Sequence, residues 1–566
     1  MTDNEPSKVA ADEVAHMKWW GWGDPEVSFA HNDKPQLRGF IQKHIDVDVA
    51  LPGVAPLSID DLQIAPSVVP AALRKQLEGV VGVENVRDDK LERVMHAYGK
   101  SLRDIVRLRR GDAGRTPDAV LYPASEAEVE DLLRIALDAD AVLIPFGGGS
   151  NISGSLEAER SETRPVLSLD MGRMNRLLDI DAPANLARIE AGALGPDLEK
   201  QLNNRGWTIG HFPDSFNHST LGGWIATRSS GMQSDKYGDI ADITRGLRVV
   251  TPKGVVAIKP FPSTSTGPSV REMVLGSEGR LGIITEATVQ VHRIPEKREI
   301  QAYLFPSFAQ GVRAMNEIAS SDAAPSVTRI SDANETQFSF ATKKESSRVD
   351  QLKSDAMKMF LEKRKNYDVT KMCLSFIGYE GTPENVKRQK KLVGDIVSSY
   401  SGIGIGSSPG QLYDQKKFDT PYIRDFLLDR GVFADVSETA TSWSRLVPLY
   451  EGVVKRANAA YDELGTKGWI MCHLSHSYHS GACLYFTFAF KPVDGRDELE
   501  QYDMVKHAIQ QGFIDLNGTL SHHHAVGVEH KPWLEQDISP AGVAIMRTLL
   551  DGVDEKRNLN PGKIVD

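Results

Sequence analysis

Three glycine-rich segments between residues 145 and 291 constrain the fold of this chain more than any other feature. They read PFGGGSNISGS (145–155), PDSFNHSTLGGWIATRSSGMQSDKYGDIADI (213–243) and LGSEGRLGIITEATVQV (275–291). In the first, consecutive glycines follow a short apolar run, so no Cβ obstructs the turn and backbone N–H groups can close around a phosphate. It is neither a P-loop nor a G-x-G-x-x-G fingerprint. Three such segments in one region predict a large phosphate-bearing cofactor that is held mainly by backbone.

The residues around these segments alternate between predicted helices and strands. SEAEVEDLLRIALDAD, which starts at 125, joins a serine cap to helical apolar spacing, and AVLIPF, which starts at 141, is an apolar run that ends in glycines. PDLEKQLNNRG (196–206) reads as a helix closed by glycine. A second strand-helix pattern begins near 297, and GACLYFTFAF (481–490) is the strongest late strand. The pattern predicts one α/β domain up to about residue 295 and another domain beyond it.

Taken in order, the motifs P-x-G-G-G-[ST], P-D-S…T-L-G-G and G-S-E-G-x-L-G-I-[IV]-T-x-A resemble the FAD domain of the vanillyl-alcohol-oxidase-like flavoproteins. The resemblance covers about residues 115–295 and implies a fold that combines α/β and α+β parts. We therefore expect a two-part FAD-binding domain of the PCMH type and an α+β cap domain for the substrate. The expected order is a largely helical N-terminal extension (1–110), the FAD domain (111–295), the cap domain (296–500) and a C-terminal segment with a histidine-rich loop (501–566).

The same resemblance implies which residues hold FAD. The first loop would wrap the pyrophosphate, and the other two segments would line the rest of the cofactor. Some relatives attach the flavin through a histidine near the first loop, whereas this loop carries Asn151 and no histidine, so we expect non-covalent FAD. The expected FAD-binding residues are Pro145, Gly147, Gly148, Gly149, Ser150, Asn151, Ile152, Ser153, Pro213, Asp214, Ser215, Ser219, Thr220, Gly222, Gly223, Thr227, Arg228, Ser229, Ser230, Gly276, Ser277, Glu278, Gly279, Gly282, Ile283 and Ile284.

The rest of the chain resembles one branch of these flavoproteins, the alkyldihydroxyacetonephosphate synthase family of ether-lipid synthesis. The resemblance rests on MKWWGWGDPEVSF (17–29), GGWIATRSSGMQSDKYGDI, PYIRD (421–425), GACLYFTFAF, and GTLSHHHAVG with KPWL. It implies that the acyl group of acyl-dihydroxyacetone phosphate is exchanged for a long-chain fatty alcohol. The implied reaction involves no net redox change and passes through a bond between flavin N5 and C1 of the dihydroxyacetone phosphate moiety.

Three residues outside the FAD domain match positions that the family uses in function. Arg424 falls at the phosphate-binding position, and a buried guanidinium suits a dianionic phosphate ester. Arg329 falls at the position of another important arginine, although a purely structural ion pair is an alternative. Tyr485 matches the catalytic tyrosine that removes a proton from C1, and its strand period places Cys483 and Thr487 on the same face. A phenol, whose ordinary pKa is about 10, needs a lowered pKa to act as a base near neutral pH.

The run His522-His523-His524 allows several interpretations. It lies inside the chain, so it is not a terminal tag, and consecutive side chains diverge, which disfavours a single metal ion. A polar loop is the default for such a run, but the resemblance moves it to the active site. There, histidines can activate the alcohol and bind phosphate. We expect an acid/base loop with no metal, and the sequence leaves open which histidine is the base.

Two other functions share parts of this pattern. FAD-dependent dehydrogenases of D-2-hydroxy acids, such as D-lactate or D-2-hydroxyglutarate, carry H-V-G-D-G-N-x-H and G-E-H-G-x-G, whose histidines and glutamate bind a metal. Here the matching segments read SHSYHSGACLYF and HHH, so that metal set is broken. A non-enzymatic flavin scaffold or lipid carrier is the other alternative, and the presence of Arg424, Tyr485 and the histidine run disfavours it.

Composition adds expectations about partners and location. A net charge of −11 argues against nucleic acid, and 566 residues are too many for one core. Three cysteines without C-x-x-C spacing fit a reducing compartment. We found no signal peptide, apolar span or peroxisomal address, so we expect a cytoplasmic protein. Because its substrates live in membranes, we expect peripheral membrane contact through an apolar patch of the N-terminal region or second domain, and the resemblance implies a homodimer.

Overall fold

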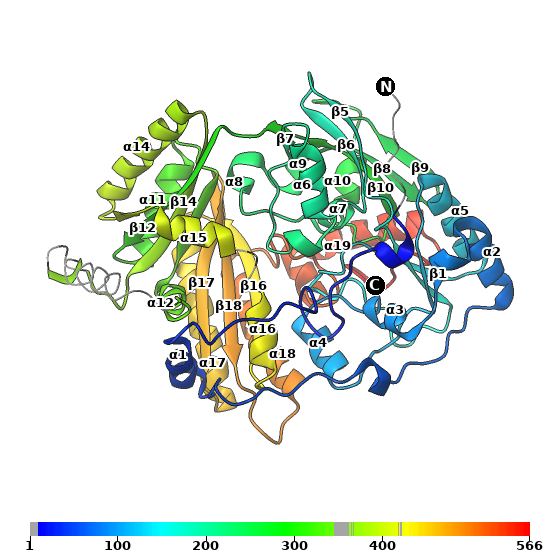
Figure 1. Cartoon of the computed structure of the whole chain (residues 1–566), viewed down its shortest axis with the longest axis horizontal. Coiled ribbons are helices and arrows are strands. Elements are labelled where there is room, and N and C mark those ends of the chain that lie inside the picture. Colours follow the sequence, from blue (N-terminus) through cyan, green and yellow to red (C-terminus); the bar gives the residue numbers. More distant parts are fainter. Residues whose placement is uncertain (1–8, 345–360, 364, 366, 417, 419–420) are drawn as a thin grey trace.

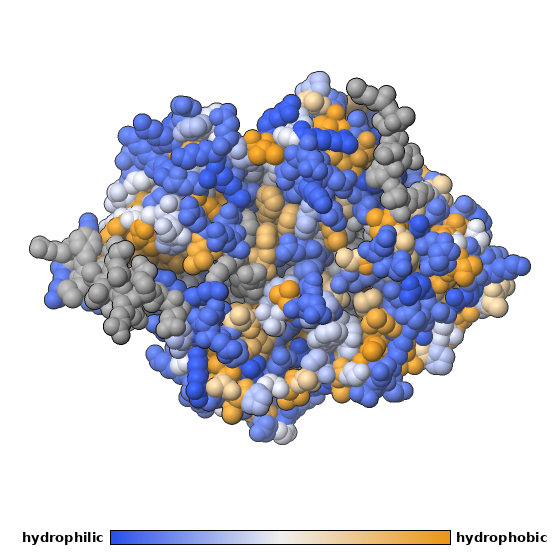
Figure 2. Space-filling view, in the orientation of Figure 1, coloured by the Kyte–Doolittle hydropathy of each residue, from blue (hydrophilic) through white to orange (hydrophobic). Residues whose placement is uncertain are grey.

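The computed structural model describes residues 9–344, 361–363, 365, 367–416, 418 and 421–566. They form two lobes, the expected FAD lobe and the expected cap lobe, which lie side by side in Figure 1. A central pocket is lined by residues of both lobes. Among these residues, no helix is both long and apolar enough to cross a bilayer. Most of the face shown in Figure 2 is hydrophilic, and its apolar residues are scattered in small groups.

The FAD lobe contains two main sheets and one short ribbon. In the first sheet β2, β4 and β3 are parallel and β1 is antiparallel to β2, in the order β1 (Val86–Arg87), β2 (Ala119–Leu121), β4 (Val166–Asp170), β3 (Val142–Phe146). The second is antiparallel, in the order β5 (Leu177–Asp181), β6 (Leu186–Glu190), β10 (Ile283–Gln290), β8 (Thr244–Thr251), β9 (Gly254–Ile258). The ribbon pairs β7 (Trp207–Thr208) with β11 (His292–Arg293).

Helices of the FAD lobe pack on these sheets as the apolar spacing predicts. Ser125 caps α5 by accepting the N–H of Glu128, and the buried face of this helix, including Val129 and Leu132, packs on the first sheet. The helices of this lobe are α2 (Ala71–Val81), α3 (Lys90–Met95), α4 (Leu102–Arg109), α5 (Glu126–Asp138), α6 (Gly195–Asn203), α7 (Leu221–Thr227), α8 (Ser234–Tyr237), α9 (Ile240–Ile243) and α10 (Val270–Val274).

The cap lobe is built on one antiparallel sheet of seven strands. Its order is β15 (Ile403–Gly406), β12 (Lys297–Phe305), β14 (Cys373–Gly381), β13 (Val327–Ser331), β17 (Gly468–Ser477), β18 (Gly481–Phe490), β16 (Phe433–Ser442). One face carries the largest core of the molecule, which includes residues of α11 (Phe308–Ala319), α14 (Pro383–Ser399), α17 (Leu446–Leu464) and α18 (Glu498–Asp515). Since α18 belongs to this core, the cap lobe extends past residue 500.

The strand β18 shows how this sheet serves both the core and the pocket. Alternate side chains of a strand point to opposite faces. Phe486 is fully buried in the core, whereas Tyr485 and Thr487 are half-buried and line the pocket. The remaining helices are α12 (Ala333–Ala341), α15 (Ser408–Lys416), α16 (Tyr422–Leu428) and α19 (Leu534–Val553), the last with a kink at Ser539.

The N-terminal segment contacts both lobes. Trp19 packs with Leu62 and Tyr98 on the FAD lobe, whereas α1 (Leu37–Ile45) packs on the cap lobe beside Phe426. Residues 14–36 contain no helix, so this part is a strap of loops. In Figure 1 the strap runs in dark blue from the FAD lobe to α1 at the cap. Short 3-10 helices complete the chain: Ala11–Glu13, Ile59–Asp61, Val83–Asn85, Phe216–His218 and Lys531–Trp533.

Candidate active site

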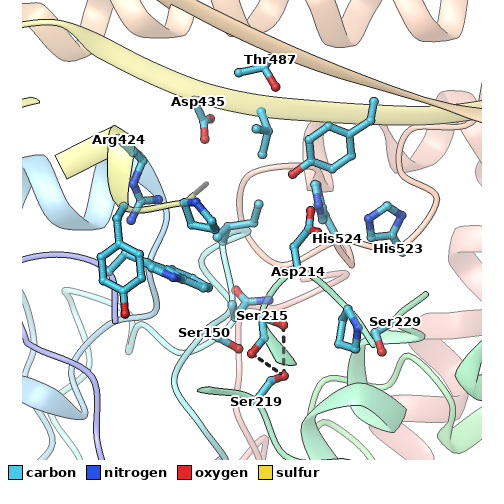
Figure 3. A pocket seen from close by; sticks show the side chains of 18 of the residues that line it. Ser150, Asp214, Ser215, Ser219, Ser229, Arg424, Asp435, Thr487, His523 and His524 are labelled. Carbon is cyan, nitrogen blue, oxygen red and sulfur yellow. Dashed lines mark hydrogen bonds between the residues drawn. The ribbon is translucent and has the colours of Figure 1, made fainter. Parts of the chain in front are cut away.

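One cavity of about 770 Å³ lies between the FAD lobe, the cap sheet and the N-terminal strap. This volume is toward the upper end of the range for small-molecule and cofactor sites. Figure 3 shows Arg424 on one side of the cavity and His523 and His524 on the other, with Asp214 between them. The cavity therefore brings residues of both lobes into one site.

The first glycine loop has the geometry of a phosphate cradle. β3 ends at Phe146, and the backbone N–H groups of Gly147, Gly148, Gly149 and Ser150 donate to no protein acceptor among the described residues. A Cβ at Gly148 would collide with the carbonyl oxygen of His218, and Gly149 has a φ of +66°. Backbone donors that are partly buried need partners. The loop thus fits a pyrophosphate, as an FAD site requires.

Most of the expected FAD-binding residues line this cavity, but four do not. Arg228 forms a surface ion pair with Glu272 at 3.2 Å, with 46% of its side chain exposed, so it points away from the site. Ser153 is buried and hydrogen-bonded to Asn151 and Ser155. Gly276 and Ser277 also lie outside the cavity lining. These four residues were included in the prediction because they lie in the FAD-binding segments and contribute to the conformation of those loops. In the structure they do not line the pocket.

A buried carboxylate holds the histidine loop in place. Glu438, on β16, accepts the backbone N–H groups of His522 at 2.7 Å, His523 at 3.0 Å and His524 at 3.1 Å. It also accepts the hydroxyl of Ser521 at 2.7 Å. Burial raises the pKa of Glu438, but the three histidines and these hydrogen bonds outweigh burial and hold that pKa well below its usual value. The backbone N–H groups of the histidine loop therefore surround the ionised carboxylate of Glu438.

The three histidines occupy different positions. His523 and His524 line the cavity around Tyr485: the His523 ring stacks on it with centroids 6.0 Å apart, and the His524 ring meets it edge-on at 5.5 Å. His522 lies outside the cavity lining. Its Nε2 is 2.6 Å from the hydroxyl of Tyr478, and its Nδ1 is 2.9 Å from Nδ1 of His523.

Burial keeps the two pocket histidines neutral near pH 7. It lowers the pKa of His524 to about 4 and that of His523 well below the ordinary value, despite the opposing charge of Glu438. A neutral imidazole can accept a proton from a bound alcohol. The structure thus places two proton acceptors at the cavity wall.

Tyr485 does not meet the condition for a phenolate base from protein groups alone. Burial, followed by the negative charges of Asp214 and Glu438, raises its pKa well above the usual value, and the opposing effect of Arg329 is smaller. The phenol therefore keeps its proton. In this state Tyr485 can donate a hydrogen bond to a substrate oxygen.

Arg424 has side-chain N–H donors that are available to bind an anion. Its Nη1 donates to the carbonyl of Lys100 at 2.6 Å, whereas its buried Nε and Nη2 have no hydrogen-bond partner among the described residues. Leaving such donors without an acceptor is costly. The adjacent Asp425 uses Oδ2 to accept the N–H of Trp22 at 2.7 Å and to pair with Lys18 at 3.3 Å. Its Oδ1 lies 3.9 Å from Nε of Arg424, which is an ion pair beyond hydrogen-bond distance. The PYIRD and MKWWGWGD motifs thus meet at this arginine.

Arg329 also borders the cavity, but its charge is already matched. Its Nη2 donates to Glu335 at 2.6 Å and lies 3.1 Å from Nδ1 of His473. Burial raises the pKa of Glu335, but His473 and Arg329 lower it more, to about 2. This is the ion pair that the sequence left as an alternative, and it leaves Arg329 less able than Arg424 to attract a second anion.

Within the described part of the chain, two side-chain clusters have atoms close enough to hold a metal. The first cluster consists of His476, Cys483, His522 and His523, and the second consists of His16, His96 and Asp170. Within each cluster the candidate ligand atoms lie within 4.8 Å of one another. Hydrogen bonds already use these atoms. His476 Nε2 bonds to the carbonyl of Gly231 at 3.0 Å, and Nε2 of both His16 and His96 faces Asp170 Oδ2 at 2.8 and 2.9 Å.

The sequence did not reveal several residues of this site. Glu438, Tyr478 and Asp239 belong to no expected set, and Glu438 bonds to a backbone 84 residues later. An apolar wall was also missed, to which the strap and α1 contribute alongside the cap. It includes Phe29, Phe40, Ile41, Ile45, Phe338 and Leu427. This wall gives the polar site an arm suited to a hydrocarbon chain.

Comparison with known proteins first defines the class. Residues 117–258 match the family model "FAD binding domain", and residues 294–564 match "FAD linked oxidases, C-terminal domain". The fold is also that of p-cresol methylhydroxylase, with a TM-score of 0.63 at 15% identity over 89% of this chain and 99% of that one. The chain is thus a flavoprotein with the expected fold class, and FAD is its cofactor.

Closer relatives then define the family. The chain is 39% identical to the alkyldihydroxyacetonephosphate synthase of Dictyostelium discoideum, over 99% of this chain and 95% of that one. It is 34% identical to that of Trypanosoma brucei brucei, over 99% and 94%. A solved alkyldihydroxyacetonephosphate synthase structure superposes with a TM-score of 0.84 at 37% identity, covering 97% of this chain and 99% of that one. The chain belongs to the alkyldihydroxyacetonephosphate synthase family, and the expected assignment to an FAD-dependent enzyme of the transferase class is confirmed.

Proposed function

We propose that this protein exchanges the acyl chain of acyl-dihydroxyacetone phosphate for a long-chain fatty alcohol, giving alkyl-dihydroxyacetone phosphate and a fatty acid for ether-lipid synthesis. One observation carries the proposal: Arg424, with two unpartnered donors, shares one cavity with the phosphate cradle, the histidine loop and an apolar wall. A phosphorylated lipid substrate needs all four of these features.

Each group has a role that its geometry supports. Arg424 would bind the phosphate of the substrate through Nε and Nη2, which fixes the dihydroxyacetone end in the polar part of the cavity. Bound FAD would supply an electron sink that retains this moiety while the chains are exchanged. Tyr485, which keeps its proton, would donate a hydrogen bond to a substrate oxygen, and the histidine loop would take the proton of the alcohol.

The apolar wall gives the hydrocarbon chain its place. Burial of apolar surface contributes about 0.8 kcal/mol per methylene, so a long chain can dominate the affinity. Because α1 and the strap form part of this wall, we propose that they also approach the membrane that supplies the substrates. Co-sedimentation with liposomes tests this contact, and a protein that stays entirely in the supernatant would contradict it. The proposed homodimer can be checked by light scattering.

The deciding experiment combines a flavin spectrum with an exchange assay. Purified holoenzyme is incubated with acyl-dihydroxyacetone phosphate and radiolabelled hexadecanol, and labelled alkyl product is expected with release of fatty acid. A yellow protein that forms no labelled product would contradict the proposal. Rapid bleaching of an electron-accepting dye by D-lactate or D-2-hydroxyglutarate would instead identify a hydroxy-acid dehydrogenase.

A further inference from the structure

We infer that Asp239, Tyr478 and His522 form a hydrogen-bonded relay that makes His523 the base of the exchange, with the lone pair of its Nε2 free for the alcohol. This inference rests on the proposed function, because it assigns the proton transfer of that reaction. The relay is continuous: Asp239 Oδ2 lies 2.7 Å from the Tyr478 hydroxyl, which lies 2.6 Å from His522 Nε2. His522 Nδ1 lies 2.9 Å from His523 Nδ1.

Counting protons along the relay fixes the tautomers. Burial raises the pKa of Asp239, yet the groups around it, among them the hydrogen-bond donors Ser230 and Tyr478, bring that pKa below the ordinary value, so Asp239 is an ionised acceptor. Tyr478 has a single hydroxyl proton, and it donates that proton to Asp239. The hydroxyl oxygen must then accept, so His522 Nε2 carries a proton. When the His522 ring is neutral, only one of its nitrogens is protonated. His522 Nδ1 therefore accepts from His523 Nδ1, which leaves Nε2 of His523 unprotonated.

The other two histidines lack this arrangement. His522 is not part of the cavity lining, so it cannot contact the alcohol directly. His524 does line the cavity, but its Nδ1 lies 3.7 Å from Glu438, beyond hydrogen-bond distance, and nothing orders its tautomer in this way. Of the three histidines in the run, His523 is the one that combines a place at the cavity, stacking on Tyr485 and a fixed tautomer. His473 also stacks on Tyr485 at the cavity, but its Nδ1 is engaged by the Glu335–Arg329 ion pair and it lies outside the relay.

The proton transfer balances along the same path. The alcohol O–H bond breaks, its proton bonds to Nε2 of His523, and the oxygen bonds to C1 of the dihydroxyacetone phosphate moiety, from which the fatty acid has already left. The electron pair of the bond that retained this moiety would return to bound FAD. The Nδ1 proton of His523 then moves to Nδ1 of His522, and the Nε2 proton of His522 can pass to Tyr478 as Tyr478 protonates Asp239. Positive charge is thereby moved from the cavity toward a carboxylate. Other titratable groups also lie beside this path. The ring centroid of His476 lies 5.3 Å from that of His522, that of His524 lies 4.5 Å from that of His523, and Glu438 lies 3.7 Å from His523 Nδ1. Tyr485 stacks on His523, the thiol of Cys483 lies within 4.8 Å of a ring nitrogen of His522 and of His523, and Asp235 interacts electrostatically with Asp239.

Two variants test the relay as positioning residues. Tyr478→Phe keeps the ring and removes the hydroxyl, so we expect kcat for exchange to fall at least about 10-fold while KM for the acyl substrate stays within about 2-fold. The acid limb of the kcat–pH profile should move to lower pH, because the imidazolium loses its link to the carboxylate. Asp239→Asn retains an acceptor for Tyr478 but removes the charge. It should also move the acid limb to lower pH, but with a smaller loss of kcat.

A matched control separates this role from general packing. Tyr450→Phe removes a tyrosine hydroxyl that also donates to a buried aspartate, Asp332 at 2.9 Å, in the cap core. We expect it to lower the melting temperature and leave the pH profile unchanged. Wild-type kcat and pH profile in both relay variants, with FAD content intact, would overturn the inference.

A spectroscopic readout keeps the relay testable even if the wild-type enzyme performs no exchange, which would refute the proposed function alone. In holoenzyme labelled with ¹⁵N-histidine, the tautomers at His522 and His523 can be assigned by comparison with His522→Gln and His523→Gln. We expect His523 protonated at Nδ1 in the wild type and a mixture of tautomers in Tyr478→Phe. A wild-type His523 protonated at Nε2 would overturn the inference.

Discussion

The two sides of the central cavity are built in different ways. The FAD cradle uses backbone groups of loops that are contiguous in sequence, such as Gly147–Ile152. The reaction centre uses side chains delivered by distant strands and loops, and its histidines depend on Glu438, 84 residues away from His522. A cradle made of backbone tolerates no added bulk, whereas a centre made of side chains depends on hydrogen-bond partners. The two sides should therefore fail differently when they are mutated.

The largest effect is expected at the cradle. Gly148→Val places a side chain against the carbonyl of His218, so the purified protein should lose most of its bound FAD. Visible flavin absorbance per protein measures this loss. Gly79→Ala is the control, since no atom lies within 4 Å of a Cβ there. It should keep its FAD and gain up to about 1 kcal/mol of stability, because alanine favours the helix. If purified Gly148→Val kept its full flavin content, the FAD cradle would tolerate added bulk, and the proposed difference between the two sides of the cavity would be wrong.

A substrate-side change should spare FAD and weaken binding. Arg424→Met removes the two unpartnered donors, so KM for the acyl substrate should rise about 10- to 100-fold, the range for a lost charged hydrogen bond. Inhibition by inorganic phosphate should weaken in parallel. Arg430→Met serves as control, because this arginine bonds to the carbonyls of Val49 and Phe426 outside the cavity. An unchanged KM in Arg424→Met would place the phosphate elsewhere.

Glu438→Gln should disturb the reaction centre while the cradle keeps its cofactor. The amide NH₂ faces backbone donors, so exchange should slow by about 10-fold and unfolding at neutral pH should become easier by about 1–3 kcal/mol. The folded-state pKa of Glu438 is depressed, so its contribution is present above the ordinary carboxyl pKa and is lost as pH falls through the folded pKa. The stability gap between wild type and variant, from denaturant titrations, should therefore shrink on acidification. If the stability difference between wild type and Glu438→Gln grew on acidification, the ionised carboxylate of Glu438 would be excluded as the group that stabilises the histidine loop.

The smallest effect is expected where the strap meets the FAD lobe. His16→Gln breaks the 2.8 Å contact with Asp170 and should cost about 1 kcal/mol. Burial lowers the pKa of His16, but Asp170 raises it more, so the folded pKa lies above its ordinary value. The contribution is complete below the ordinary pKa and is lost as pH rises through the folded pKa. Thermal melts should show the largest difference between variant and wild type in mild acid and a vanishing one in alkali.

The same contrast explains how much the sequence could predict. The glycine motifs identified the cradle and the cofactor because backbone sites leave contiguous patterns, and Ser125 and its apolar spacing predicted α5 within the chain. Arg424 and Tyr485 were expected from resemblance, and the structure adds their surroundings. Glu438 left no signal, since a lone acidic residue in a strand has no local pattern. Asp239 and Tyr478 lie inside the quoted segments PDSFNHSTLGGWIATRSSGMQSDKYGDIADI and SHSYHSGACLYF, but nothing in these patterns assigned either residue a role. Their significance comes only from partners that the tertiary fold brings to them.

The strap has a consequence for the order in which the chain can assemble. The N–H of Trp22 bonds to Asp425, a residue 403 positions later, and α1 packs on the same lobe. As the ribosome releases the chain, the strap has no complete surface to dock on until the cap has emerged. Contacts across such a separation in sequence form late, because closing the loop between them costs entropy. The apolar wall of the cavity is therefore expected to close last, after the lobe that receives FAD can already have folded.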